Sequence, residues 1–266
     1  MSDEKLTTPP GIDTSVAHPA RVWDYWLDGK DNFAPDREVG DHILQALPEF
    51  QMIARADREF LGRAVRYLAG DVGVRQFLDI GTGIPTANNT HQVAQSVAPD
   101  SRIVYVDNDP IVLVHARALL TSSEEGATEY IDADMNDPDA IIEQAKATLD
   151  FDKPVAITML AILEFVPETS AAQSIVRRLL DATPAGSFFV MSGPVHGEAM
   201  DRAAQLWNES GATPVTIRSL EEQRSMFDGL ELLEPGLVPL PQWRPEPSTL
   251  YTEQDFPYVG GIGRKG

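Results

Sequence analysis

Cysteine is absent from the 266-residue chain. Without a thiol the protein has no disulfide, no thiolate nucleophile and no cysteine-ligated zinc. Long apolar runs are missing as well, because no segment approaches the ~20 residues that a membrane-spanning helix needs. The opening residues, MSDEKLTTPPGIDTS, contain no apolar stretch and are unlike a secretory signal. These absences predict a cytoplasmic protein that does not partner with membranes.

Positive charge is scarce: 21 Lys and Arg stand against 41 Asp and Glu, a formal net charge of −20. Such a surface repels phosphate backbones, which argues against nucleic acid as a partner. The five histidines show no ligand spacing, so the sequence predicts no metal site. Hydrophobic residues make up 42% of the chain, enough to exclude wholesale disorder. Nothing in the composition indicates an oligomeric state.

Three parts are expected along the chain. Residues 1–18 are polar and predict a flexible tail, and residues 19–70 carry apolar side chains at helical spacing and predict a helical cap. In residues 71–266 short apolar segments alternate with helical ones, which is the pattern of a doubly wound, mostly parallel α/β sheet. The cap helices are expected at 21–28, at 35–46 and from 48 to a stop at Gly70.

Strands and helices of the third part follow from apolar runs and helix-start signals. Asp-Pro pairs at 109–110 and 137–138 each predict a helix start, because Asp caps the helix and Pro fits its first turn. The expected strands are 76–80, 102–106, 128–131, 154–160, 187–192, 230–235 and 258–263. The other expected helices are 88–98, 168–182, 197–210 and 219–227.

The segment FLDIGTGIPT, residues 77–86, marks a candidate ligand site where the first strand meets its helix. A dinucleotide fold would need a third glycine where Thr86 stands. A nucleoside with an amino-acid tail, such as S-adenosylmethionine, has no phosphate, and its ammonium group suits Asp79 before Gly81 and Gly83. Because such glycine turns are also common as plain structure, this segment alone leaves the alternatives open.

Acidic residues also end the next two strands. Asp107 stands at the tip of the second strand, where a carboxylate accepts hydrogen bonds from ribose hydroxyls. Asp109 is better explained as the cap of the following helix. Asp134 follows the third strand and is placed to accept a hydrogen bond from an adenine amino group, or to be a solvated loop acid. Three acids at successive strand ends favour a nucleoside ligand that carries a sulfonium and an ammonium group.

With these motifs the chain resembles the Rossmann-like S-adenosylmethionine-dependent methyltransferases. More narrowly, it resembles a bacterial S-adenosyl methyltransferase family first described as a domain of unknown function. The resemblance runs from Pro19 to Arg264 and rests most on PARVWDYWLDGKDNFAPDRE (19–38) and VYVDNDPIVLVHARALL (104–120). It implies a seven-stranded sheet with an antiparallel last strand, and S-adenosylmethionine as the cofactor. The donor-binding residues it implies are Asp79, Gly81, Thr82, Gly83, Asp107, Asn108, Asp134 and Met135.

Two stretches depart from the family pattern. Glu164 stands where relatives have a histidine between leucine and phenylalanine, and Gly193 stands where they have a histidine after serine. Glu164 directly follows the strand expected at 154–160, so it should face the ligand edge of the sheet. A carboxylate there would act as a general base or hold an acceptor amine. The alternative is an exposed acid that begins the next helix.

The helical cap offers candidates for substrate and donor contacts. Trp23, Tyr25 and Trp26 are either core residues or part of a lid that contacts the substrate. Lys30, Asn32 or Arg58 is expected to hold the methionine carboxylate, without a choice among them.

Taken together, the sequence predicts an S-adenosylmethionine-dependent methyltransferase that acts on a small-molecule acceptor. The alternative is a protein that binds S-adenosylmethionine or a nucleoside without turnover, as a sensor would. A nicotinamide oxidoreductase is disfavoured by Thr86.

Overall fold

The computed structural model describes residues 13–112, 114 and 121–266. The expected tail at 1–18 therefore lies largely outside the described residues, as does much of the helix that was expected to begin after Asp109. No helix within the described ranges is long and apolar enough to cross a membrane.

The N-terminal helices are α1 (Pro19–Trp26), α2 (Ala34–Ala46) and α3 (Phe50–Arg66). Asp36 of α2, which is fully buried, joins α2 to α1 by accepting hydrogen bonds from the backbone of His18 and Phe33 and from the Arg21 guanidinium. The predicted stop at Gly70 is wrong, because a π-helical turn continues α3 over Tyr67–Val72. That turn ends at Gly73, whose φ of 85° is readily adopted by glycine.

The described residues form a sheet of eight strands, not the seven that were expected, and their order is β3-β2-β1-β4-β5-β8-β6, with β7 paired to β8. The additional strand is β7, whose two residues are too few to leave a pattern in the sequence. Strands β1 to β5 are parallel, and β8 runs antiparallel between β5 and β6, so the expectation of an antiparallel last strand is confirmed. The strands are β1 (Gln76–Ile80), β2 (Arg102–Asp107), β3 (Ala127–Asp132), β4 (Ala156–Leu160), β5 (Phe188–Pro194), β6 (Leu230–Leu232), β7 (Val238–Pro239) and β8 (Tyr258–Lys265).

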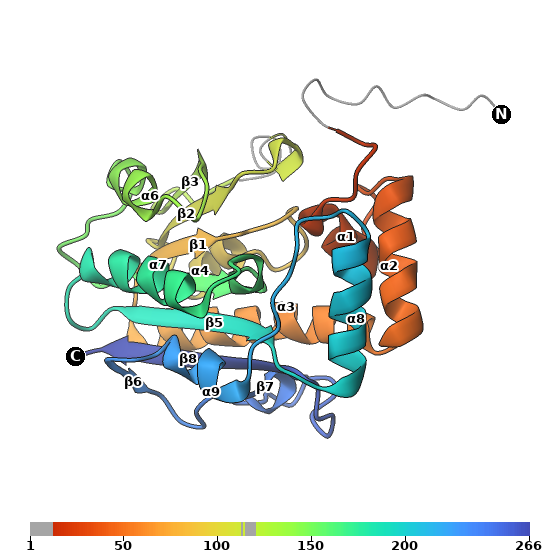
Figure 1. Ribbon diagram of the computed structural model, residues 1–266. Helices are drawn as coiled ribbons and strands as arrows, with labels where there is room; N and C mark the ends of the chain where they lie inside the picture. Colours follow the sequence, from red (N-terminus) through yellow and green to blue (C-terminus); the bar gives the residue numbers. More distant parts are fainter. Residues whose placement is uncertain (1–12, 113, 115–120) are drawn as a thin grey trace.

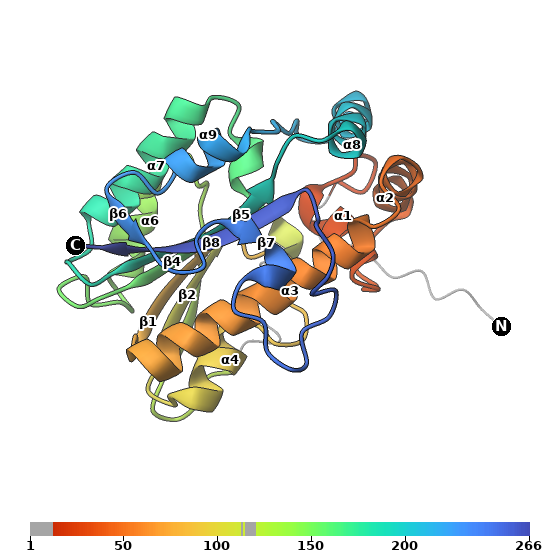
Figure 2. The same ribbon diagram turned by 90° about the horizontal axis from the view of Figure 1, so that it is seen from below.

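Helices cover both faces of this sheet (Figure 2). Because successive strand residues point to opposite faces, Phe77 packs in the core beneath α3 and α4, whereas Leu78 packs in the core beneath α6 and α7. On the face covered by α3 and α4, helix α3 lies very close to the sheet, since a Cβ on Gly260 of β8 would lie 2.8 Å from the Phe60 ring of α3. The helices after α3 are α4 (Thr90–Val97), α6 (Pro138–Ala145), α7 (Thr169–Asp181), α8 (Glu198–Glu209) and α9 (Leu220–Ser225).

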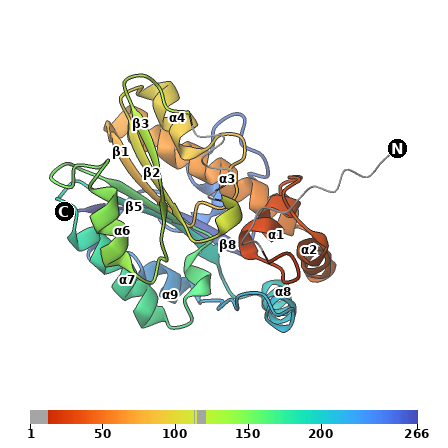
Figure 3. The ribbon, with the colours of Figure 1, turned by 90° about the horizontal axis from the view of Figure 1, so that it is seen from above.

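Helices α1, α2 and α8 gather at one end of the molecule (Figures 1 and 3). Helix α2 packs against both α1 and α8. Trp26 of α1 is buried there and contacts the rings of Phe50 and Trp207. This end of the molecule faces the carboxyl ends of the parallel strands, so α1 and α2 stand over the edge where ligands bind in such sheets, whereas α3, also part of the expected cap, packs along a face of the sheet.

Candidate functional site

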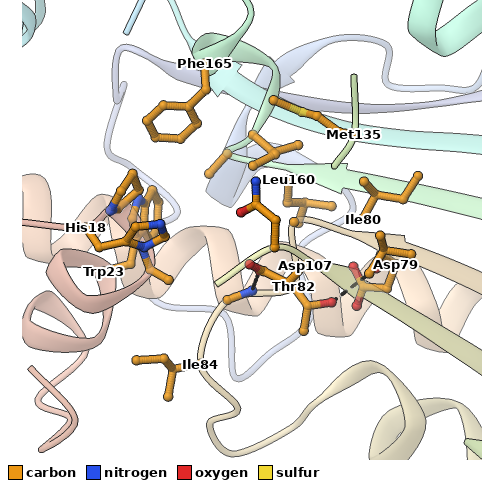
Figure 4. A pocket seen from close by; sticks show the side chains of 18 of the residues that line it. His18, Trp23, Asp79, Ile80, Thr82, Ile84, Asp107, Met135, Leu160 and Phe165 are labelled. Carbon is orange, nitrogen blue, oxygen red and sulfur yellow. Dashed lines mark hydrogen bonds between the residues drawn. The ribbon is translucent and has the colours of Figure 1, made fainter. Parts of the chain in front are cut away.

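A cavity of about 290 Å³ lies at the carboxyl ends of β1, β2 and β4, beneath the cap. Its walls contain nine of the predicted donor-binding residues: Arg58, Asp79, Gly81, Thr82, Gly83, Asp107, Asn108, Asp134 and Met135. In Figure 4, Asp79, Thr82 and Asp107 lie together, and His18 and Trp23 lie across from them. The structure therefore brings together residues that are more than seventy positions apart in the sequence.

The turn after β1 needs its glycines for two different reasons. Gly81 has a φ of 74°, and a Cβ there would lie 2.5 Å from the Ile162 side chain. Gly83 also has a positive φ, 67°, but a Cβ there would meet nothing within 4 Å. Gly81 is thus required by packing, whereas Gly83 leaves open space on the wall of the cavity. Such space allows a ligand to approach the backbone.

The two acids at the ends of β1 and β2 are held by different kinds of hydrogen-bond donor. Asp79 is buried, and its oxygens accept hydrogen bonds from the hydroxyls of Thr90 (2.6 Å) and Thr158 (2.8 Å). Asp107 accepts from the backbone N–H groups of Gly83 (2.8 Å) and Asp109 (3.0 Å). Burial raises the pKa of both carboxyl groups above the usual range, and the hydrogen bonds to each act in the opposite direction. Asp107 is thereby aimed at the glycine turn.

Asp134 lies at the outer edge of the cavity. It is exposed, and one of its oxygens accepts from both the backbone and the side-chain amide of Asn136. Met135 is half-buried beside it and adds an apolar surface. This combination of an acceptor edge and an apolar face is suited to a flat, nitrogen-rich ring such as adenine.

The roof of the cavity is formed by Trp23 and Asp24 of α1 and by Leu27, which directly follows the helix. The ring of His18, which caps the start of α1, lies 2.7 Å from the Asp109 carboxylate and ties the roof to the end of β2. Asn32 does not line the cavity. Its amide donates to Asp24 (2.8 Å) instead, and so positions a residue that does.

Arg58 and Asp57 of α3 reach the cavity from its other side. The Nε atom of Arg58 is buried and has no hydrogen-bond partner in the part of the chain that the structure describes. A buried guanidinium nitrogen without a partner fits the carboxylate of a bound amino-acid group. Lys30, by contrast, is exposed and outside the cavity wall.

Asp57 is a residue that sequence reasoning missed. It is buried, and its carboxylate accepts a hydrogen bond from the Ser192 hydroxyl at 2.5 Å. Burial raises the pKa of Asp57 to about 6, although the Ser192 hydrogen bond opposes the rise. The available signal was its spacing: Asp57 lies four residues from both Ile53 and Leu61, on the apolar stripe of α3 where a charged side chain is unexpected.

Glu164 lies in a short 3₁₀ turn, Leu163–Phe165, after β4, and it is only 6% exposed. The expectation of an exposed helix-start acid therefore does not hold. Its Oε1 accepts a hydrogen bond from the Tyr258 hydroxyl at 2.8 Å, and its Oε2 is buried with no partner among the described residues. Burial raises the pKa of Glu164 to about 7. Its carboxyl group faces a second cavity rather than the first.

The second cavity is bounded by aromatic side chains of the cap and of α8. Trp23 and Phe165 belong to the walls of both cavities, so the two cavities are neighbours. Of the three predicted substrate contacts, Trp23 and Trp26 line this second cavity. Tyr25 does not, since its hydroxyl donates to Asp41 (2.7 Å) on the surface of the cap.

The cavity residues fit S-adenosylmethionine. A buried Arg58 nitrogen without a partner among the described residues suits a carboxylate, open space at Gly83 admits a chain, and Asp107 presents a carboxylate that can accept hydrogen bonds from hydroxyl groups. Across the described ranges, no three His, Asp or Glu side chains are grouped to hold a metal ion.

Two solved structures resemble the whole chain. A DUF574 family protein from Streptomyces avermitilis MA-4680 is 44% identical, with a TM-score of 0.92, and the match covers 96% of this chain and 99% of that one. A protein from Thermobifida fusca YX, provisionally described as a methyltransferase, is 38% identical, with a TM-score of 0.88 and coverage of 98% and 99%.

A more distant structure, magnesium protoporphyrin IX methyltransferase from Synechocystis PCC 6803 with bound S-adenosylhomocysteine, is 12% identical. Its TM-score is 0.52, with coverage of 92% of this chain and 98% of that one, so it shares the fold alone. A search of curated proteins gives no match. Residues 5–266 match the family described as S-adenosyl methyltransferase. The chain therefore belongs to the S-adenosyl methyltransferase family, whose cofactor is S-adenosylmethionine.

Proposed function

We propose that this protein transfers the methyl group of S-adenosylmethionine to a small-molecule acceptor. The observation that carries the proposal is the pair of neighbouring cavities beneath the cap, which share Trp23 and Phe165 as walls. The first is lined by the strand-end acids and the glycine turn, and the second contains a buried carboxyl group. A donor and an acceptor held side by side in this way need no further diffusion to react.

The donor would occupy the first cavity. Arg58 would hold its carboxylate, Asp107 its ribose, and Asp134 with Met135 its adenine. Asp79, whose oxygens are already used by two threonine hydroxyls, would favour the ammonium group through its negative charge rather than by a free oxygen. When bound, S-adenosylmethionine supplies a methyl group on a positively charged sulfur.

Glu164 would take up the proton that the acceptor loses. Its pKa of about 7 places it near the range in which a carboxylate accepts a proton efficiently at neutral pH. Tyr258 donates to one oxygen and thereby orients the carboxyl group, while Oε2 stays without a partner among the described residues and Glu164 lines the second cavity. Alignment of the acceptor and exclusion of water by the aromatic walls would supply the remaining catalysis.

Calorimetric titration with S-adenosylmethionine, S-adenosylhomocysteine and NAD tests the donor site. Asp107→Ala should weaken binding of both adenosyl compounds by about 10- to 100-fold, since it removes acceptor hydrogen bonds worth roughly 1.5–3 kcal/mol. Asp132→Ala is the matched control, because Asp132 ends the neighbouring strand, is exposed and lies outside the cavity wall. Tighter binding of NAD, or equal binding by wild type and Asp107→Ala, would overturn the proposal.

A further inference from the structure

Glu164 lines the second cavity, and one of its carboxyl oxygens is buried with no hydrogen-bond partner among the described residues. The indole N–H of Trp26 points to the Gly40 carbonyl and that of Trp207 donates to the Thr213 carbonyl, so both rings present carbon to the cavity. The Tyr258 hydroxyl donates to Glu164 Oε1. Among the described residues, Glu164 Oε2 remains buried and unpartnered. A ligand in this cavity therefore has to offer Glu164 a hydrogen-bond donor.

The charged groups near the second cavity restrict the charge that its ligand can carry. A second buried carboxyl group, Asp57, lies close enough to raise the pKa of Glu164, although burial is the larger cause. Arg218, the cation that acts on Glu164, already donates to Thr169 and to the carbonyls of Leu163 and Val166. None of the described residues that line the cavity is a Lys or Arg, so a carboxylate or phosphate ligand would meet negative charge there. An ammonium group, by contrast, gains from the carboxylates and from the faces of the aromatic rings.

The volume of the second cavity and the residues of its walls limit the size and polarity of the ligand. The cavity holds about 40 Å³, space for roughly three water-sized groups. The walls are carbon-rich, from Trp23, Trp26, Phe165, Trp207 and Tyr258. We propose that the second cavity binds the methyl acceptor, and that this acceptor is a small apolar amine whose nitrogen lies against Glu164. This inference rests on the proposed function and adds the class of acceptor to it.

The chemistry balances with groups already described. The bound ammonium gives one proton to the Glu164 carboxylate, which leaves a lone pair on nitrogen. That lone pair forms the new N–C bond to the donor methyl group, while the electron pair of the broken C–S bond stays on sulfur. The products are a methylated ammonium that now carries the positive charge, protonated Glu164 and S-adenosylhomocysteine with a neutral sulfur.

Binding alone tests the acceptor site. With S-adenosylhomocysteine present at saturation, ligand-observed NMR and calorimetry would compare ethylamine with its neutral analogue ethanol and with formate, an anion of similar size. Methylamine and methanol form a smaller pair. Each amine should bind at least about tenfold more tightly than its alcohol, and formate should not bind. In Glu164→Gln the advantage of the amines should disappear.

A substitution that fills the second cavity tests whether the amine binds there. Ala204 lies on the cavity wall and is only partly buried in α8, so Ala204→Met should fold and obstruct amine binding at least tenfold. Gln205→Met is the matched control, because Gln205 is exposed on the same helix and lies outside the cavity wall. Both variants should bind S-adenosylmethionine as wild type does.

The outcomes separate this inference from the proposed function. If S-adenosylmethionine binds but neither amine does, or if Ala204→Met leaves amine binding unchanged, the acceptor cavity is wrong and the donor site stands. Alcohols that bind as well as the amines would overturn the amine class and point to a hydroxyl acceptor. If S-adenosylmethionine itself fails to bind, the proposed function fails first.

Discussion

The surroundings of Glu164 bring the pKa of its carboxyl group close to neutral pH. The groups that face it are Tyr258 from β8, Asp57 from α3 and Arg218 from the segment before α9. Burial outweighs the hydrogen bond from Tyr258 and raises the pKa of Glu164 to about 7. A side chain in this state can accept a proton at neutral pH and return it when the site opens to water.

Glu164→Gln should separate catalysis from donor binding. The amide still accepts from Tyr258 but takes up no proton, so turnover should fall by ~10²-fold or more while S-adenosylmethionine affinity stays near wild type. Methyl transfer to an identified acceptor, measured beside calorimetry, checks both. The control is Glu168→Gln, an exposed carboxyl group four residues on. A collapse of donor binding would make Glu164 a structural residue, and unchanged turnover would remove it from the mechanism.

The same variant should change how stability depends on pH. Because the folded pKa of about 7 lies above the usual value of 4.5, the folded state holds this proton to higher pH than the unfolded state does. Glu164 therefore lowers the free energy of unfolding progressively from about pH 4.5 to pH 7, and its cost is constant above that. Glu164→Gln should flatten this decline and gain about 2–4 kcal/mol at pH 8 relative to pH 4. Urea unfolding across this range measures it, and parallel wild-type and variant curves would contradict it.

Helix α1 and the loop after it work as a single element of the donor site. Asp24 near the end of α1 accepts hydrogen bonds from Asp31 and Asn32 (2.9 and 2.8 Å), so the loop folds around this carboxylate. Gly29 makes the fold possible, since a Cβ there would lie 1.9 Å from Asp24 Oδ1. The position of the roof thus depends on one glycine outside the cavity.

A pair of glycine substitutions tests this dependence. Gly29→Ala should displace Asp24, lower stability by about 1–3 kcal/mol and weaken S-adenosylmethionine binding several-fold. Gly62→Ala, in α3, meets nothing within 4 Å and should raise stability by roughly 0.5–1 kcal/mol through helix propensity, with donor binding unchanged. Thermal unfolding and calorimetry on both variants check this. Equal effects from the two would show that the Asp24 loop does not position the roof.

Elements with strong local signals could be predicted from the sequence. Strand β1 was placed without error, and the Asp-Pro signal at 137–138 is confirmed by α6, where Asp137 accepts from the Ala140 backbone. The π-helical extension of α3 could not be predicted, because Gly73 rather than Gly70 ends it and both are glycines. Strand β7 depends on pairing with β8, which is a tertiary contact.

Site residues at the ends of strands could be placed from the sequence, because the order of the strands fixes where they lie. Side chains that can bond several nearby groups could not be placed. Asp79 and Asp107 end adjacent parallel strands, so their convergence follows from topology. Asn32 and Tyr25 were predicted from residue type, and each bonds a neighbour within the cap instead. Whether the lining residues bind the donor as expected stays a prediction.

At the scale of the whole molecule, negative charge is the dominant electrostatic feature, with a formal net charge of −20. Such a field attracts cations and repels anions over the whole surface, so it favours a cationic ligand before any contact is made. It also opposes the compact state through repulsion among like charges.

Salt should therefore stabilise the protein. Raising NaCl from 0.1 M to 1 M shortens the screening length from about 10 Å to about 3 Å and weakens the repulsion. The melting temperature should rise by about 2–5 °C, which corresponds to about 1 kcal/mol for a chain of this size. Differential scanning calorimetry at a series of salt concentrations measures the shift. A melting temperature that falls with NaCl would mean that attractive ion pairs outweigh the net repulsion.

Strand β8 has a consequence for biosynthesis. It fills the interior position between β5 and β6, yet its residues come last among the strands, and its first residue, Tyr258, orients Glu164. A growing chain that has emerged only as far as β7 presents an unpaired edge on β5, where another chain can add. Neither the finished sheet nor the oriented carboxyl group exists until Tyr258 has left the ribosome. Translation that stops early therefore yields a product without the proposed active site and with a surface that invites aggregation.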